Sequence, residues 1–172
     1  MPVAPKAASP DHSSNIVGKG SNRSKRSSEH LANCELQKGK VILAFKTKIL
    51  GRDIDVIAPD GSEIRLLAEM QNGSFVHCTL PVGGVSKAVQ HKTIEEIWFF
   101  LDGEGEVWRE LGEDSETVTV RTGTTLTIPT GAHFQFRNIG EQPLRFVIAT
   151  MPPWPGEAEA VRVPDHWPTQ DG

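Results

Sequence analysis

The densest group of side chains that could bind a metal or transfer a proton consists of His91, Glu95 and Glu96. Imidazole and carboxylate groups are common ligands of divalent metals, and the same groups act as general bases and acids. The run 97–101 (IWFFL) follows directly and ends in a turn. A short, apolar, aromatic run of this kind predicts a buried strand. We therefore expect His91 and Glu96 to present polar groups to the interior of a β-barrel.

The bulk composition describes a globular protein with room for one domain and a tail. The chain has 172 residues, 37% hydrophobic and 23% charged, with a net charge of -4, which argues against a nucleic-acid partner. No apolar run approaches the roughly 20 residues that span a bilayer, and no secretory signal is visible. We therefore expect a cytoplasmic protein without a membrane partner. Cys34 and Cys78 lack metal-binding spacing and are expected to be reduced.

Turn residues divide the middle of the chain into short alternating segments. The turns include Pro59-Asp60-Gly61 and Asn72-Gly73, whose residue types favour tight turns and hairpins. Strands are expected at 53–57, 64–70, 75–80, 97–101, 104–110, 116–121, 124–128, 132–137 and 144–150. The run 41–50 fits a short helix or a strand equally well. Many short strands with frequent turns predict a β-sandwich or barrel.

The pattern also suggests boundaries. Residues 1–35 are rich in Ser, Pro, Lys and Arg, a composition typical of a disordered tail, and their short basic patch is expected to be solvated. We place the barrel at 36–155. Residues 156–172 are expected to form a C-terminal loop or tail, with Trp154 and Trp167 providing its packing contacts.

Two spaced motifs resemble those of the cupin superfamily, which consists of jelly-roll β-barrels (double-stranded β-helices). Gly83, His91, Glu96 and Gly103 match the first motif, G-x5-H-x-H-x(3,4)-E-x6-G. Gly123, Pro129, Gly131 and Asn138 match the second, G-x5-P-x-G-x2-H-x3-N. The chain also resembles a subset of single-domain bacterial cupins whose function is generally unassigned. The resemblance implies an all-β, cupin-type jelly-roll barrel.

Two metal-binding positions of the family are replaced in this sequence. The resemblance implies that two histidines and the glutamate of the first motif, with the histidine of the second, hold a divalent metal. Val89 and Phe134 stand at two of these positions, so His91 and Glu96 alone remain. His133 is one residue early and would need a bulge to reach the site. Either no metal binds tightly, or iron, manganese, nickel or zinc binds to His91, Glu96 and His133.

Three functions remain open at this point. The first is a binding module that holds a small polar, carbohydrate-like or aromatic ligand between a polar pair, His91 and Glu96, and walls that we expect to include Trp98, Phe100, Phe134, Phe136 and His77. The second is a metal-dependent dioxygenase, isomerase or decarboxylase with a rescued third ligand. The third is a metal-free isomerase-like enzyme with His91 and Glu96 as catalytic acid and base. The replaced metal positions favour the first.

A homodimer is expected, because exposed sheet edges need cover. Trp154 and Trp167 are the candidates for its apolar contact.

Overall fold

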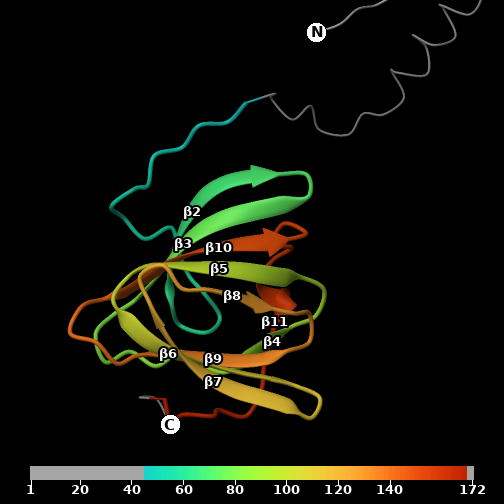
Figure 1. Cartoon of the computed structure of the whole chain (residues 1–172). Coiled ribbons are helices and arrows are strands. Elements are labelled where there is room, and N and C mark those ends of the chain that lie inside the picture. Colours follow the sequence, from blue (N-terminus) through green and yellow to red (C-terminus); the bar gives the residue numbers. More distant parts are fainter. Residues whose placement is uncertain (1–44, 170–172) are drawn as a thin grey trace, which may run out of the picture. The chain divides into compact units, whose positions relative to one another are not determined.

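Alternating residues between tight turns form eleven short strands in residues 45–169, the part of the chain that the computed structural model describes (Figure 1). The strands are β1 (Val56–Ile57), β2 (Glu63–Met70), β3 (Gly73–Leu80), β4 (Val89–His91), β5 (Glu95–Asp102), β6 (Glu104–Leu111), β7 (Asp114–Arg121), β8 (Thr125–Ile128), β9 (His133–Asn138), β10 (Leu144–Met151) and β11 (Ala160–Arg162). A single 3-10 turn, η1 (Glu157–Glu159), precedes β11. The expected tail 1–35, its boundary at residue 36 and Cys34 lie outside the described residues.

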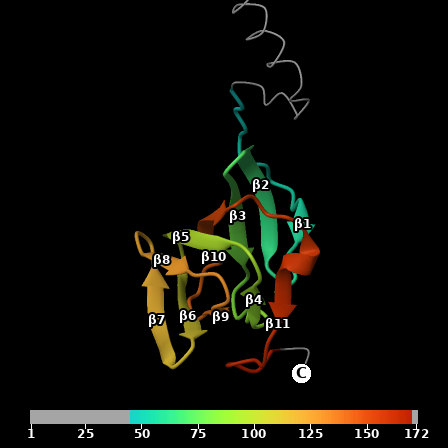
Figure 2. The same cartoon turned by 90° about the vertical axis from the view of Figure 1, so that its right-hand side faces the viewer.

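The strands form two antiparallel sheets that close the barrel (Figures 1 and 2). One sheet has the order β1-β2-β3-β10-β5-β8, and the other has the order β11-β4-β9-β6-β7. This arrangement is the expected all-β jelly-roll class. Within residues 45–169, no helix is long and apolar enough to cross a bilayer.

Aromatic side chains from both sheets fill the core between them. Trp98 and Phe100 of β5 lie against Phe146 of β10, with ring centroids 4.8 Å away in each case. Phe136 of β9 meets Phe146 edge-on at 5.4 Å. Cys78 is also fully buried in this core, and burial raises the pKa of its thiol well above the ordinary value. Such packing fixes the inner face of β5, which also carries Glu96.

Turn geometry explains one glycine of the first motif. Gly103 joins β5 to β6 with a φ of 82°, and a Cβ atom there would lie 2.6 Å from the carbonyl oxygen of Pro143. Both the left-handed conformation and the close backbone approach require glycine.

The structure corrects three sequence-based expectations. Val89–His91 forms β4, although no strand was expected before residue 97 in this region. The C-terminal segment, expected to be loop, contributes β11, which pairs with β4. Of the expected strand 53–57, only Val56 and Ile57 pair, and residues 45–50 form neither helix nor strand. Short pairs of this kind carry too few residues for a visible alternation.

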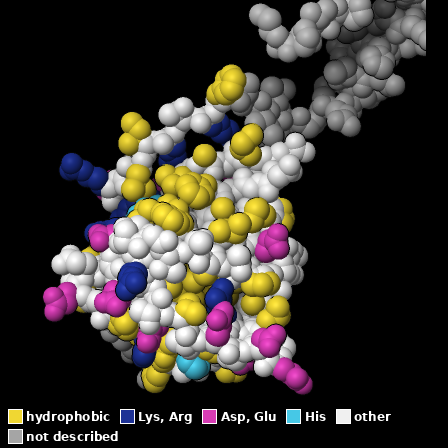
Figure 3. Space-filling model, viewed as in Figure 1, with side chains coloured by type: hydrophobic (Ala, Val, Ile, Leu, Met, Phe, Trp, Pro, Cys, Tyr) yellow, Lys and Arg dark blue, Asp and Glu magenta, His cyan; other side chains and the backbone are white. Residues whose placement is uncertain are grey.

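The outer faces of the two sheets differ in how far their apolar side chains are covered. Trp167 packs with Ala88 and Trp108 on the five-stranded sheet, where Gln135 donates to the Trp167 carbonyl oxygen and accepts from its backbone N–H. On the six-stranded sheet, Phe75, Ile97 and Phe99 remain exposed in the described structure. Hydrophobic side chains gather in the upper half of the view in Figure 3, where β2 and β3 lie in Figure 1.

Candidate functional site

Glu96 faces the barrel interior because β5 alternates strictly. Glu96, Trp98 and Phe100 are buried, whereas Glu95, the third member of the acidic and histidine group, is exposed. The carboxyl group of Glu96 is only 5% exposed, and its Oε2 atom accepts a hydrogen bond of 2.7 Å from Trp98 Nε1. The indole N–H thus satisfies one carboxyl oxygen and leaves the other facing the cavity.

His91 reaches the same interior from the opposite sheet. It ends β4, opposite Ala160 of β11. Its ring lies edge-on to Phe134 at 5.1 Å and to Trp154 at 5.5 Å between ring centroids. The Nδ1 atom is buried and has no hydrogen-bond partner among the described residues. Leaving a buried nitrogen without a hydrogen bond costs stability, so a bound molecule that supplies this hydrogen bond would be favoured.

His91 and Glu96 are neighbours but not a hydrogen-bonded pair. The distance from His91 Nδ1 to Glu96 Oε1 is 3.9 Å. Burial lowers the pKa of His91 to about 4, although the Glu159 carboxylate opposes this shift. Burial also raises the pKa of Glu96 to about 8, against the effect of the Trp98 hydrogen bond. At neutral pH the site therefore holds an uncharged imidazole and a protonated carboxyl group, rather than the ion pair that their proximity alone suggests.

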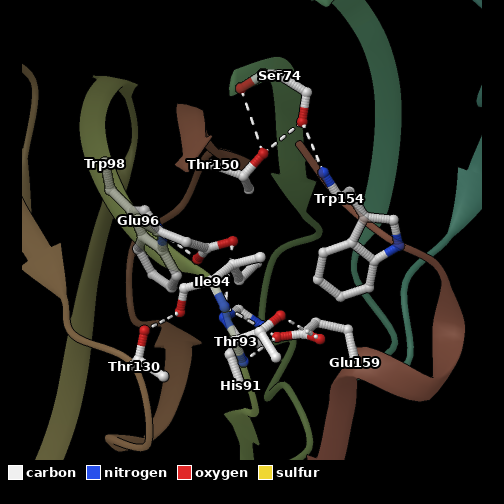
Figure 4. A network of polar contacts seen from close by, with 10 residues as sticks. All are labelled: Ser74, His91, Thr93, Ile94, Glu96, Trp98, Thr130, Thr150, Trp154 and Glu159. Carbon is white, nitrogen blue, oxygen red and sulfur yellow. Dashed lines mark hydrogen bonds and ion pairs between the residues drawn. The ribbon is translucent and has the colours of Figure 1, made fainter. Parts of the chain in front are cut away.

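A second carboxylate, Glu159, holds the loop between His91 and Glu96. Its Oε1 atom accepts from the backbone N–H groups of Thr93 at 2.6 Å and Ile94 at 3.0 Å, and its Oε2 atom accepts from Thr93 Oγ1 at 2.9 Å. Figure 4 shows Glu159 beside His91 and below Trp154. Sequence reasoning missed Glu159, because only the pairing of β11 with β4 brings it to the site.

Two hydroxyl groups complete the polar side of the site. Thr150 is paired opposite Glu96 on one side and opposite Ser74 on the other, so the three side chains form a row across β5, β10 and β3. The Ser74 and Thr150 hydroxyl groups are hydrogen-bonded to each other, and the backbone N–H of Trp154 donates to Ser74 Oγ at 3.2 Å (Figure 4). The sequence carries no motif for this row, in which Thr150 is more than 50 residues away from each of its two neighbours.

These groups line a cavity of about 510 Å³. The lining includes Ser74, Val76, Val89, His91, Glu96, Trp98, Phe134, Ile148, Thr150 and Trp154, and it continues to β1, β2, Lys46 and Lys48. Its volume lies in the range of small-molecule sites. Of the expected wall residues, Trp98 and Phe134 line this cavity. Phe100, Phe136 and His77 are not part of its lining.

The other two histidines considered as site residues lie away from the cavity. His133 Nδ1 lies 3.7 Å from Glu110 Oε1, on the face of β9 opposite to Phe134, without the bulge that a metal ligand would require. His77 lies beside Arg65 and Val147 across β2, β3 and β10. Burial, and then the charges of Arg65 and Arg145, lower the pKa of His77.

The residues present do not fit the divalent metal that the barrel motifs imply. Val89 and Phe134 are paired opposite each other in the five-stranded sheet, and both side chains are 2% exposed. Within residues 45–169, no three His, Cys, Asp or Glu side chains come together as a possible metal site. One imidazole and one carboxyl group provide only two donors, fewer than metal sites in proteins use.

Comparisons with known proteins agree on the fold. The profile of a family described as "Cupin domain" matches residues 76–150. The uncharacterized protein MJ1618 of Methanocaldococcus jannaschii is 32% identical over 119 residues, which cover 64% of this chain and 92% of that protein.

Two crystal structures superimpose with a TM-score of 0.50. BH2720 of Bacillus halodurans is 21% identical and is matched over 55% of this chain and 73% of its own. An uncharacterized conserved protein with a double-stranded β-helix domain from Klebsiella pneumoniae is 18% identical, over 60% of this chain and 85% of its own. At these identities, the two structures support the fold alone.

Proposed function

This chain belongs to the cupin family, and we propose that it binds a small organic molecule inside the barrel without a metal ion. The observation that carries this proposal is the unpartnered Nδ1 atom of buried His91, which lines a cavity whose neighbouring metal-binding positions are hydrocarbon. Val89 and Phe134 donate no electron pair to a metal, yet both add apolar surface for a ligand.

The polar end of the cavity is suited to one uncharged polar group of the ligand. Neutral His91 offers an acceptor at Nδ1, and protonated Glu96 offers a donor 3.9 Å away. A hydroxyl group can donate to the first and accept from the second. The ligand is therefore a small polar or carbohydrate-like molecule, or another molecule with a hydroxyl or amide head.

Elemental analysis after exhaustive dialysis tests the metal-free character. We expect well below one equivalent of iron, manganese, nickel or zinc per chain. One equivalent that disappears on His91→Ala would instead favour a metal-dependent cupin enzyme with a third ligand that the proposed site lacks.

The raised pKa of Glu96 supports metal-free acid catalysis as a second candidate function. Glu96, with a pKa of about 8, remains protonated at neutral pH and can act as an acid, whereas the pKa of about 4 makes His91 a weak base that stays uncharged beside it. Small-molecule hits from a thermal-shift screen of the full chain would be incubated with the protein and analysed for products. Turnover lost in His91→Gln with binding retained would identify an enzyme, whereas binding without any product would favour the binding module.

A further inference from the structure

We infer that the cavity takes an elongated amphipathic molecule, with one polar head at His91 and an apolar body that lies across the strands towards β1. This inference rests on the proposed function of the cavity and specifies its ligand class. Among the ligands considered above, it selects a chain-like molecule rather than a sugar.

The length of the cavity follows from the strands that line it. Its lining includes Glu96 of β5, Thr150 of β10, Ser74 of β3, Ile64 of β2 and Val56 of β1. These five strands are consecutive neighbours in the six-stranded sheet. Neighbouring strands lie about 4.8 Å apart, so the lining extends over roughly 19 Å across the sheet. A single sugar ring would fill only one end.

The middle of the cavity is apolar. Ile64, Val76 and Ile148 line it from three neighbouring strands, and Trp154 also belongs to its lining. Leu66 lines the section closer to β1 and is half-exposed. Such walls bind hydrocarbon by the hydrophobic effect and offer no hydrogen bonds to hydroxyl groups.

The polar groups along the middle already have partners. The hydroxyl groups of Ser74 and Thr150 bond to each other, and Asp60 accepts from the backbone N–H and the hydroxyl group of Ser62. Among the buried side-chain nitrogen and oxygen atoms of residues 45–169, His91 Nδ1 is the one without a partner that belongs to a residue lining the cavity, and Glu96 Oε1 lies 3.9 Å from it. These two neighbouring atoms at one end suit one head group, and the several hydroxyl groups of a sugar would be left unpaired.

The far end of the cavity opens among charged, exposed side chains. Lys46, Lys48 and Glu69 line it and are exposed. A solvated group, such as a carboxylate, can therefore end the molecule there without a desolvation penalty. The matching ligand has a polar head, an apolar chain and a second polar end, as in an ω-hydroxy fatty acid.

Isothermal titration calorimetry on the full chain tests this ligand class with four probes: ω-hydroxydecanoate, ω-hydroxybutanoate, decanoate and glucose. We expect ω-hydroxydecanoate to bind most tightly, with affinity rising about fourfold for each added buried methylene. Decanoate, which lacks the head hydroxyl, should bind roughly threefold to tenfold more weakly. Two results together would overturn the inference and leave the proposed function intact: glucose binds, and the affinity of the three chain-like probes does not depend on their length.

Aspartate substitutions at two residues with similar exposed fractions test where the apolar chain of the ligand lies. Leu66, 47% exposed, lines the cavity, whereas Ile97, 45% exposed, lies on the outer face of β5. We expect Leu66→Asp to weaken ω-hydroxydecanoate binding at least about tenfold, because the new charge meets the apolar chain. Ile97→Asp should leave the binding of ω-hydroxydecanoate unchanged.

Equal effects of the two substitutions would contradict the inference. So would a failure of all four probes to bind the folded protein. The proposed function itself fails only if the protein also carries one equivalent of metal that depends on His91, which separates the two outcomes.

Discussion

The Nδ1 atom of His91 and the Oε1 atom of Glu96 approach each other from opposite sheets of the barrel and stop 3.9 Å apart. Burial holds both groups in their uncharged forms at neutral pH, with pKa values of about 4 for His91 and about 8 for Glu96. The pair is therefore a donor and an acceptor held apart in the wall of one cavity, from which a ligand group can approach both.

The raised pKa of Glu96 makes stability depend on pH. The folded state keeps the Glu96 proton up to about pH 8, whereas the unfolded chain loses it near pH 4.5. Between these values Glu96 binds more protons in the folded state than in the unfolded chain, so this group makes the free energy of unfolding fall as pH rises, by up to about 1.4 kcal/mol per pH unit. Below about pH 6.5 the lowered pKa of His91 acts in the opposite direction. Glu96→Gln mimics the protonated group, so we expect it to be more stable than the wild type at pH 8.

Urea unfolding at several pH values measures this effect. The advantage of Glu96→Gln should shrink as pH falls and vanish near the ordinary carboxyl pKa of 4.5. Glu95→Gln, on the exposed face of the same strand, is the matched control and should leave the pH dependence unchanged. An identical pH dependence of stability in the wild type and in Glu96→Gln would contradict the assignment.

Restoring the replaced positions should create a metal site. In Val89→His/Phe134→His, two imidazoles would join His91 and Glu96 on facing strands. We expect this variant to hold about one equivalent of zinc or nickel after dialysis, and to lose it again when His91→Ala is added. The exchange of a buried phenylalanine should cost about 2–4 kcal/mol in the absence of metal. An equal metal content in the unmodified protein would show that Val89 and Phe134 do not prevent binding.

The barrel could be predicted from the sequence because its long strands alternate. In β5 the buried residues Glu96, Trp98 and Phe100 alternate with exposed ones, so the facing of Glu96 follows from periodicity alone. Strands β4 and β11 have three residues each, and too few residues alternate to predict them. Their pairing depends on tertiary contacts, and it is this pairing that brings Glu159 beside His91.

The site could be predicted only where motif spacing or alternation along one strand specifies it. His91 and Glu96, which the motif spacing selects, both line the cavity, and His133 faces away from Phe134, as alternation along their strand predicts. The distance between His91 and Glu96, and hence their uncharged state, depends on how the two sheets pack. Ser74 and Thr150 form a row across strands far apart in the sequence, which no local pattern encodes.

We expect the homodimer to form through the outer face of the six-stranded sheet rather than through Trp154 and Trp167. Trp167 is buried and Trp154 lies against His91, whereas Phe99 and Ile97 are each 45% exposed. Large exposed apolar patches often mark protein contacts. We expect light scattering to give the mass of two chains, and Phe99→Lys to give that of one. Leu111→Lys, at the end of β6, is the exposure-matched control and should leave the mass unchanged.

The last prediction concerns the carboxylate that holds the loop after His91. Glu159 is 5% exposed and accepts three hydrogen bonds from Thr93 and Ile94. Burial alone would raise the pKa of Glu159, but these hydrogen bonds lower it overall, so its contribution to stability is present above pH 4.5 and is lost as pH falls below that value. Glu159→Ala leaves two backbone N–H groups unpaired and should cost about 3 kcal/mol at pH 7, with a smaller loss at pH 3.

Glu157→Ala, in the same turn but exposed, should cost little, and urea titrations of both variants provide the measurement. An equal loss in the two variants would mean that Glu159 does not hold the loop.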